Sequence, residues 1–281
     1  MDFEKLNDYL ERSFEYKAIK EIGAELPVVY LDENATRTSM WFLDLGPIHR
    51  KVCESVPYLY DVDLVTNRLM RRKRISFVPF EDKGVARDYH TPLVGNIYSK
   101  GYIGCNFGYT ETVKDVPAHG HIMGHLYEHV LLGRKPRDAK SHSDEMILKN
   151  VLPITMEKLM LEEFGNEALS EYYKKLRAAR FKKMCMVDDL VRNADCAITH
   201  EMLVDSLDYD VSITYTDVLD YCAEIEYGND PVYKSYCYYV ADMLATRMVE
   251  RGTFKKDIQA LLKAKSVEEL DVVLNPEIVK R

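Results

Sequence analysis

The amino-acid sequence predicts a mostly helical α+β protein in which a small sheet precedes a bundle of helices. Residues 75–113 are rich in Ile, Val, Phe and Tyr and are broken by glycines, which is typical of short strands. After Pro117, apolar side chains recur at helical spacing in nearly every segment. No fixed-period repeat or low-complexity segment interrupts the 281 residues. We therefore expect one continuous unit with two lobes.

The first 90 residues are the part of the chain whose pattern is least regular. Apolar residues at helical spacing predict a helix over 2–22, and the segment LPVVYLDE at 26–33 predicts a short strand. Residues 37–75 are mixed, with a helix expected at 62–74. We treat 1–90 as an N-terminal α/β region of unclear type.

Residues 91–281 are expected to form one mostly helical domain that begins with part of the sheet. The strand-like segments around this point are ISFVPF, PLVGNIYS and GYIGCNFGYTETV. The predicted helices cover 118–132, 143–163, 167–190, 199–206, 214–226, 231–251 and 254–263.

Composition excludes several classes of protein. The chain is 47% hydrophobic and 30% charged, which is ordinary for a globular protein and not for a disordered tail, a collagen or a coiled-coil rod. It has 38 basic and 46 acidic residues and a net charge of -8, so we expect no nucleic-acid partner. There is no apolar run of membrane-spanning length, and the acidic, amphipathic start does not resemble a signal peptide. We expect no membrane partner and a cytoplasmic location.

The six cysteines form no C-x-x-C pair and lie in apolar stretches, which predicts buried thiols rather than disulfides. The histidines are more informative, because five of the eight lie between 119 and 142. On a helix, His121 and His125 lie one turn apart on one face, and Glu128 and His129 continue it. Two imidazoles at this spacing can converge on one metal ion at roughly 2.0–2.1 Å. The alternative is a solvated helix face.

Two motif registers compete on this helix. His125-Leu-Tyr-Glu-His129 has the form H-x-x-E-H, and it resembles the zinc helix of the inverted zincins of the insulysin type. That register would make His125 and His129 the metal ligands. In those enzymes strands and a distant acidic ligand follow the helix, whereas the residues after Gly133 are helical here.

The other register, His121-Ile122-Met123-Gly124-His125, resembles the motif His-Glu-x-Gly-His of the oligoendopeptidase F and thimet oligopeptidase family. The element Asn106-Phe107-Gly108 stands before it, as an Asn-aromatic-Gly element does in that family. The resemblance covers roughly residues 90–281. It implies a zincin-like catalytic lobe with a small sheet edge, a helical bundle over a cleft, and zinc-dependent peptide hydrolysis.

Further segments follow the family's order along the chain. RFKKMCMVDDLVRNA resembles its helix of Arg-aromatic-Glu type, and TYTDVLDYCAEIEYGND resembles its Leu-x-x-x-Tyr and Tyr-Gly turn. YKSYCYYVADMLATRM resembles its Tyr-rich helix, which faces the substrate. By this resemblance the hydroxyls of Tyr236 and Tyr239 would polarise a carbonyl, although a tyrosine stripe at helical spacing is also typical of a core edge.

The chain departs from the family at two positions of the site. Ile122 stands where the family has the glutamate that takes a proton from zinc-bound water. The segment SDEMILKNVLPITME resembles the family's Glu-Val-x-Ser-x-x-Asn-Glu and puts Asn150 at the position of the third zinc ligand. Loss of that carboxylate weakens metal binding, and loss of the motif glutamate removes the general base.

Two acids could compensate for these losses. Glu145 follows His125 at the spacing at which thermolysin-like zincins place their third ligand, and Glu128 could act as the base, although it lies about 10 Å along the axis from His121. The alternative is that both are ordinary acidic residues without a role at the site.

Three functions remain open. The first is a metallopeptidase-like protein with a zinc site in a peptide-binding cleft. The second is an inactive pseudopeptidase that binds a peptide or protein segment. The third is a metal-dependent enzyme of other chemistry. We expect a peptide or small-molecule ligand and, because the cleft would be open, a covering partner or self-association.

Overall fold

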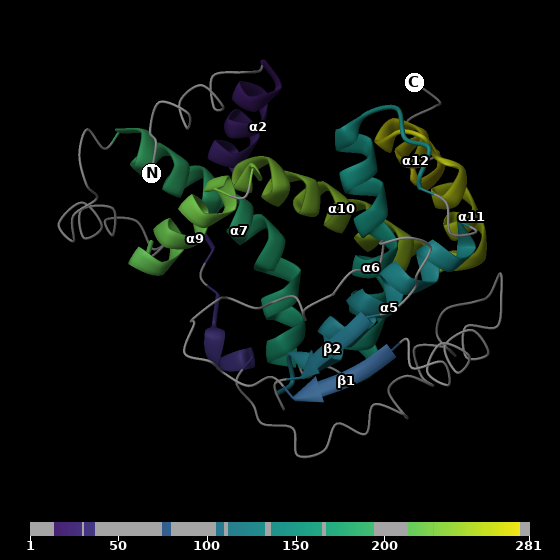
Figure 1. The fold of residues 1–281 in the computed structure, drawn as a ribbon. Coiled ribbons are helices and arrows are strands. Elements are labelled where there is room, and N and C mark those ends of the chain that lie inside the picture. The colour runs from purple at the N-terminus through teal and green to yellow at the C-terminus, as the bar shows by residue number, and fades with distance from the viewer. Residues whose placement is uncertain are drawn as a thin grey trace. The chain divides into compact units, whose positions relative to one another are not determined.

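The computed structural model describes residues 14–29, 31–36, 75–79, 105–109, 112–132, 136–164, 167–193, 213–226 and 228–275. Helices dominate these ranges, which confirms that the protein is mostly helical (Figure 1). In chain order the elements are α2 (Phe14–Glu25), the 3-10 turn η1 (Glu33–Thr36), β1 (Ile75–Pro79), β2 (Cys105–Tyr109), α5 (Asp115–Leu131), α6 (His142–Phe164), α7 (Glu167–Asn193), α9 (Tyr215–Glu226), α10 (Pro231–Arg251), α11 (Phe254–Lys263) and α12 (Val267–Leu274).

The helices from α5 to α11 lie where the apolar periodicity predicts them, with ends that shift by a few residues at most. The helix α12 was not predicted, although Ser266-Val-Glu-Glu269 has the form of a capping box. The Ser266 side chain accepts a hydrogen bond from the backbone N–H of Glu269, which starts the helix. The predicted helices at 62–74 and 199–206 lie outside the described residues, as does the predicted boundary at residue 90.

The predicted strand at 26–33 is wrong over its described residues. Leu26 ends α2 with a backbone hydrogen bond of 3.3 Å from its N–H to the carbonyl of Gly23, residues 27–29 have no regular structure, and Glu33 begins η1. Pro27 has no N–H to donate to a neighbouring strand. β-Branched residues favour a strand only where a neighbouring strand pairs with them.

Strands β1 and β2 pair in parallel, with Ile75 opposite Cys105 and Pro79 opposite Tyr109 (Figure 1). Each lies within one of the strand-like segments of the sequence, and β2 contains Asn106-Phe107-Gly108. The third segment, PLVGNIYS, lies outside the described residues. The chain runs from β2 into α5, which carries the histidines.

The chain divides into two units. Unit 1 comprises residues 1–32 and 172–239, and unit 2 comprises residues 33–171 and 240–281, so the division falls within α7 and α10. No helix in the described ranges is both long and apolar enough to cross a bilayer.

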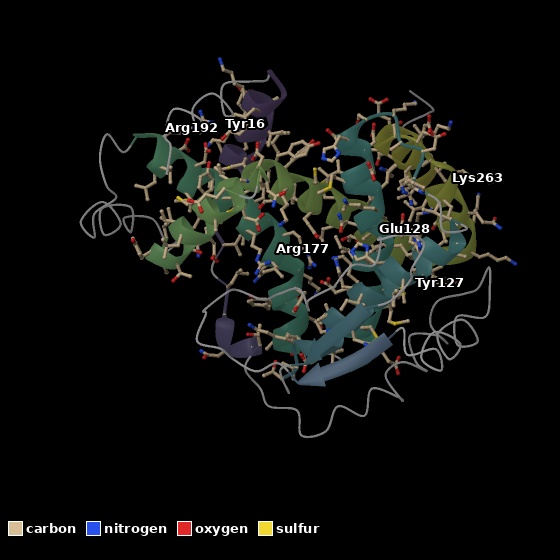
Figure 2. All side chains as sticks on the ribbon, viewed as in Figure 1. Tyr16, Tyr127, Glu128, Arg177, Arg192 and Lys263 are labelled. Atoms are coloured by element: carbon tan, nitrogen blue, oxygen red, sulfur yellow. The ribbon has the colours of Figure 1, made fainter. Side chains whose placement is uncertain are left out.

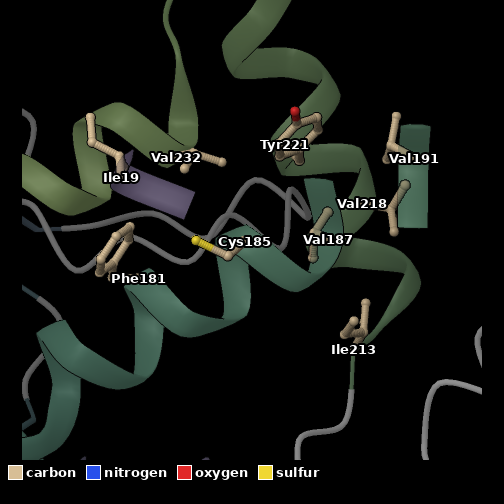
Figure 3. Packing of buried hydrophobic residues seen from close by; sticks show 9 residues of the cluster. All are labelled: Ile19, Phe181, Cys185, Val187, Val191, Ile213, Val218, Tyr221 and Val232. Carbon is tan, nitrogen blue, oxygen red and sulfur yellow. The ribbon is translucent and has the colours of Figure 1, made fainter. Parts of the chain in front are cut away.

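The core of unit 1 forms where α2, α7, α9 and the start of α10 bring apolar side chains together (Figure 3). Phe181 is one of its fully buried members and stacks on Tyr239, with ring centroids 5.7 Å apart. The cluster consists of Ile19, Phe181, Cys185, Val187, Val191, Ile213, Val218, Tyr221 and Val232. Cys185, Cys222 and Cys237 are thiols rather than disulfides, as the sequence predicts.

The core of unit 2 is built on the pair α5 and α6. Val116, Ile122 and Leu126 of α5 are buried, as are Leu148 and Leu152 of α6. These positions follow helical spacing, so each helix buries one apolar face against its neighbours.

Candidate functional site

Helices α5 and α6 approach each other so closely that only glycine fits at the contact. A side chain on Gly124 would place its Cβ 2.3 Å from the Cα of Pro153 and 2.7 Å from the proline nitrogen. A Cβ on Gly120 would lie 2.8 Å from the carbonyl oxygen of Met156 and 3.1 Å from the Cα of Glu157. Because the earlier glycine meets the later part of α6, the two helices run antiparallel (Figure 1). This contact sets which residues of α6 face the histidines of α5.

His121 lies beside a carboxylate of the neighbouring helix. Its Nδ1 lies 3.3 Å from Oε2 of Glu157, and both residues are buried, with 4% and 3% of their surface exposed. A carboxylate beside one ring nitrogen of a histidine is typical of carboxylate–histidine–metal arrangements, in which the carboxylate orients the imidazole. The sequence analysis missed Glu157. It lies seven residues, or about two turns, after Asn150, a spacing that puts both on one face of α6.

His125 lies beside His121, as their i, i+4 spacing predicts. The ring centroids are 4.9 Å apart, with an angle of 80° between the ring planes. The Nδ1 of His125 is buried and has no hydrogen-bond partner in the described part of the chain. Burial, the neighbouring His121 and the positive charge of Lys149 lower the pKa of His125 well below its ordinary value. The ring is therefore neutral at pH 7, which is the form that binds metal ions.

Asn150 offers one buried oxygen. The residue is 1% exposed, and its Nδ2 donates a hydrogen bond of 2.6 Å to the carbonyl of Met146 in the preceding turn of α6. Its Oδ1 is buried without a hydrogen-bond partner among the described residues. A buried acceptor without a partner is costly, so such an atom is a candidate for an unseen ligand.

Ile122 is an apolar core residue. It is 1% exposed, and no titratable group replaces it at that position of the helix. The general base of the resembled peptidases therefore has no equivalent there.

Glu128, which is labelled in Figure 2, continues the histidine face. It forms an ion pair with Arg137. The Nε of Arg137 lies 3.1 Å from Oε1 of Glu128, its Nη2 donates to the same oxygen, and its Nη1 donates to the carbonyl of Leu261 at 2.7 Å. Burial raises the pKa of Glu128 to about 7, although Arg137 and Lys149 act to lower it. This ion pair does not favour Glu128 as a base, and that role stays a prediction.

The other predicted ligands do not join a cluster. Glu145 lies in the first turn of α6 and is partly exposed, whereas His129 is buried near the end of α5. Within the ranges that the structure covers, no three His, Cys, Asp or Glu side chains are grouped to hold a metal ion. A histidine pair with an amide is not such a group, so the site would depend on Asn150 as its third donor.

Tyr236 and Tyr239 lie on α10 in unit 1, whereas the histidines belong to unit 2. The ring of Tyr236 lies 5.6 Å from that of Phe181, and Tyr239 stacks on the same phenylalanine. Both tyrosines therefore pack at the edge of the unit 1 core. Their predicted role toward a substrate remains a prediction.

Comparison of the chain with protein-family models, with curated proteins and with solved structures finds no match. The resemblance to the oligoendopeptidase F and thimet oligopeptidase family thus depends on the residues quoted from the sequence and on their places in the helices.

Proposed function

We propose that this chain is a zincin-like protein that has lost peptide hydrolysis and that binds a divalent metal ion between α5 and α6. The donors would be His121, His125 and Asn150. The observation that carries the proposal is the buried contact of 3.3 Å between His121 and Glu157, with His125 one turn away. An orienting carboxylate on one histidine of an i, i+4 pair is typical of metal sites.

The donor set fits a divalent ion but not a tight zinc site. Zinc accepts imidazole nitrogen and carboxylate oxygen, and catalytic sites supply three protein ligands. Here the third donor would be the neutral amide oxygen of Asn150, which is buried without a partner in the described ranges. Since one negative charge is missing, we expect weaker binding than at a site with two histidines and a glutamate. A bound ion would supply Lewis acidity at this position.

Hydrolysis does not fit these residues. A zincin needs a base beside the metal-bound water, and the corresponding residue is the buried Ile122. Glu128 is engaged with Arg137. We therefore favour the pseudopeptidase among the three functions that the sequence leaves open, with a peptide or small-molecule ligand and a cytoplasmic location as further expectations.

The test is calorimetric titration of the purified protein with Zn²⁺ and with Co²⁺. We expect one site that is lost in His121→Ala and in His125→Ala. Glu157→Gln should weaken it by about 10–100-fold, because the imidazole loses its orienting partner. His142→Ala and His129→Ala are the controls and should bind as the wild type does.

Four outcomes would contradict the proposal. The first is metal binding that persists in both single variants of the histidine pair, and the second is the absence of any stoichiometric site. Loss of binding in His129→Ala with retention in His121→Ala would favour the insulysin-like register instead. Hydrolysis of a mixed peptide library that EDTA abolishes would show that peptidase activity survives.

A further inference from the structure

The helix α2 buries little of its own surface in unit 1. Within residues 16–25 only Ile19 and Gly23 are buried, and Ile19 belongs to the unit 1 core (Figure 3). The side of the helix that carries Ala18 and Ile22 is exposed. Because the hydrophobic effect grows with the apolar area removed from water, it holds α2 only weakly. The attachment of α2 therefore depends on its polar contacts.

Lys20 makes the central polar contact of α2 with α7. Its ammonium nitrogen donates to the carbonyl of Cys185 at 2.6 Å, to Oδ2 of Asp188 at 2.9 Å and to Oδ1 of Asp189 at 2.6 Å. A lysine ammonium has three N–H donors, so each of them has an acceptor when α2 lies on α7. Hydrogen bonds that involve charged groups are stronger than those between neutral groups.

Two further contacts lie nearer the ends of α2. The guanidinium carbon of Arg192 lies 4.7 Å from the ring centroid of Tyr16, and Lys182 donates to the carbonyl of Ala24 at 2.7 Å. Both cations are partly exposed, so water can take the place of α2 around them.

The acidic groups of α7 do not need α2 to remain compensated. Asp188 is fully buried, but it also accepts hydrogen bonds from the Arg192 guanidinium at 3.0 Å and from the Tyr221 hydroxyl at 2.5 Å. The side chain of Asp189 is mostly exposed, so water solvates it. The main cost of breaking a buried ion pair is an uncompensated buried charge, and release of α2 leaves none on α7.

In its docked position α2 covers the thiol of Cys185. A side chain on Gly23 would place its Cβ 2.3 Å from Sγ of Cys185 and 3.2 Å from Cζ of Phe181. Cys185 is 3% exposed, and burial raises the pKa of its thiol to about 12. Because the thiolate is the reactive form of cysteine, the docked helix protects this thiol.

We propose that α2 is a removable cover, which leaves α7 as a unit while the rest of unit 1 stays folded, with Lys20 as the contact that holds it in place. Its release opens the thiol of Cys185 to reagents in solution. The segment after the helix allows this movement, because residues 27–29 have no regular structure and Pro27 is exposed. Local opening of this kind is typical of elements with few buried apolar contacts. The inference concerns unit 1 and does not depend on the proposed metal site.

The experiment measures how fast iodoacetamide modifies each cysteine of the folded full chain in mildly alkaline buffer, with peptide mass spectrometry to locate the label. Cys237, which is fully buried in the same unit, reports opening of unit 1 as a whole. In the wild type, Cys185 should react about tenfold faster than Cys237 or more. Hydrogen exchange of the same protein should show the amides of α2 exchanging together and ahead of those of α7.

Two variants release α2 by different means. Lys20→Met removes the ammonium and should speed the reaction of Cys185 by about tenfold or more, the effect of losing a hydrogen bond to a charged group. Gly23→Ala should speed it as well, because the new Cβ forces α2 away from Cys185 while alanine favours the helix itself. Lys17→Met, at an exposed position of α2, is the matched control and should react as the wild type does. The rate at Cys237 should stay the same in all of them.

The comparison of the two cysteines decides the inference. Modification of Cys185 at the rate of Cys237, in the wild type and in Lys20→Met, would show that α2 leaves only when unit 1 unfolds and would overturn it. Equal rates at Cys185 in Lys20→Met and Lys17→Met would overturn it too. If Lys20→Met speeds both cysteines, Gly23→Ala decides: faster reaction of Cys185 alone supports the cover, and faster reaction of both overturns it.

Discussion

Asp188 shows how a single buried charge is accommodated in unit 1. Its side chain is fully buried, its Oδ1 accepts a hydrogen bond of 2.5 Å from the Tyr221 hydroxyl, and its Oδ2 lies 2.9 Å from Lys20 and 3.0 Å from Arg192. Arg192 also stacks over the ring of Tyr16, with its guanidinium carbon 4.7 Å from the centroid (Figure 2). Two cations and a hydroxyl thus compensate one carboxylate, which links α2 and α9 to α7.

The replacement Asp188→Asn tests this network. Removing one partner of a buried ion pair leaves the other charges uncompensated, so the free energy of unfolding at pH 7 should fall by about 3–5 kcal/mol. Asp189→Asn is the matched control, because Asp189 contacts the same Lys20 at 2.6 Å with a side chain that is 61% exposed. Its effect should stay within about 0.5 kcal/mol. Urea unfolding measures both, and equal effects would contradict the assignment.

The difference in unfolding free energy between the wild type and Asp188→Asn should depend on pH with a definite sign. Burial acts to raise the pKa of Asp188, but the neighbouring Tyr16 hydroxyl and the hydrogen bonds from Tyr221 and Lys20 outweigh it, and the pKa lies below its ordinary value. The stabilisation is therefore present above the pKa of the unfolded chain, about 3.9, and is lost as the pH falls below it. The difference between the wild type and Asp188→Asn should shrink below pH 4.

At the scale of elements, the close approach of α5 and α6 is the feature on which the candidate site depends. Gly120 and Gly124 remove side chains from the contact, and Pro153 lies opposite Gly124. A proline inside a helix has no N–H for the carbonyl four residues earlier, which here belongs to Lys149. The site therefore lies where the backbone of α6 is altered and where α5 comes nearest to it.

Gly124→Ala tests the contact directly. Alanine is the better helix former by about 1 kcal/mol, so an open position would gain stability. Here the new Cβ would meet the Pro153 backbone at 2.3 Å, and we expect a net loss of about 1–3 kcal/mol from forced separation of the helices. The loss should be accompanied by weaker zinc binding. Thr216→Ala, at an exposed position of α9, is the control for helix propensity. Urea unfolding measures the stability of both variants. If Gly124→Ala gained stability as the control does, the close contact between α5 and α6 would be contradicted.

At the scale of the molecule, unit 2 is held together by polar contacts between segments far apart in the sequence. Arg137 joins α5 to α11 through Glu128 and the carbonyl of Leu261. Asp144 at the start of α6 accepts a hydrogen bond of 2.8 Å from the N–H of Val267, at the start of α12. The C-terminal helices are thereby tied to the helix pair that carries the histidines.

The burial of Glu128 predicts a pH dependence of stability. Its pKa rises from 4.5 to about 7 in the folded protein, so the folded state holds its proton more tightly than the unfolded state does. The contribution to stability is complete below pH 4.5 and is lost as the pH rises through 7. Glu128→Gln has no proton to lose, so relative to the wild type it should gain up to about 3 kcal/mol between pH 4.5 and 8.

Urea unfolding across this pH range measures the effect. Glu250→Gln, at an exposed position of α10, is the control and should follow the wild type at every pH. Parallel pH profiles for the wild type and Glu128→Gln would show that the ion pair with Arg137 keeps the carboxylate charged.

The sequence by itself determined the described helices from α5 to α11 and the shared face of His121 and His125. Both are local properties, because helical spacing places residues three and four apart on one side without any other part of the chain. The local pattern wrongly predicted a strand at 26–33, because strand-like composition does not by itself provide a neighbouring strand to pair with. The apolar pattern also did not predict the short helix α12, which the sequence marks by the capping residue Ser266.

Only the tertiary structure decided which groups surround the histidines. The contact of Glu157 with His121 and the contact of Arg137 with Glu128 require particular pairs of segments to meet at a particular register. That register depends on the glycines of α5 meeting the backbone of α6 across a distance at which no side chain fits. Contacts of this kind have no period along the chain, since they arise from packing between helices rather than from spacing within one.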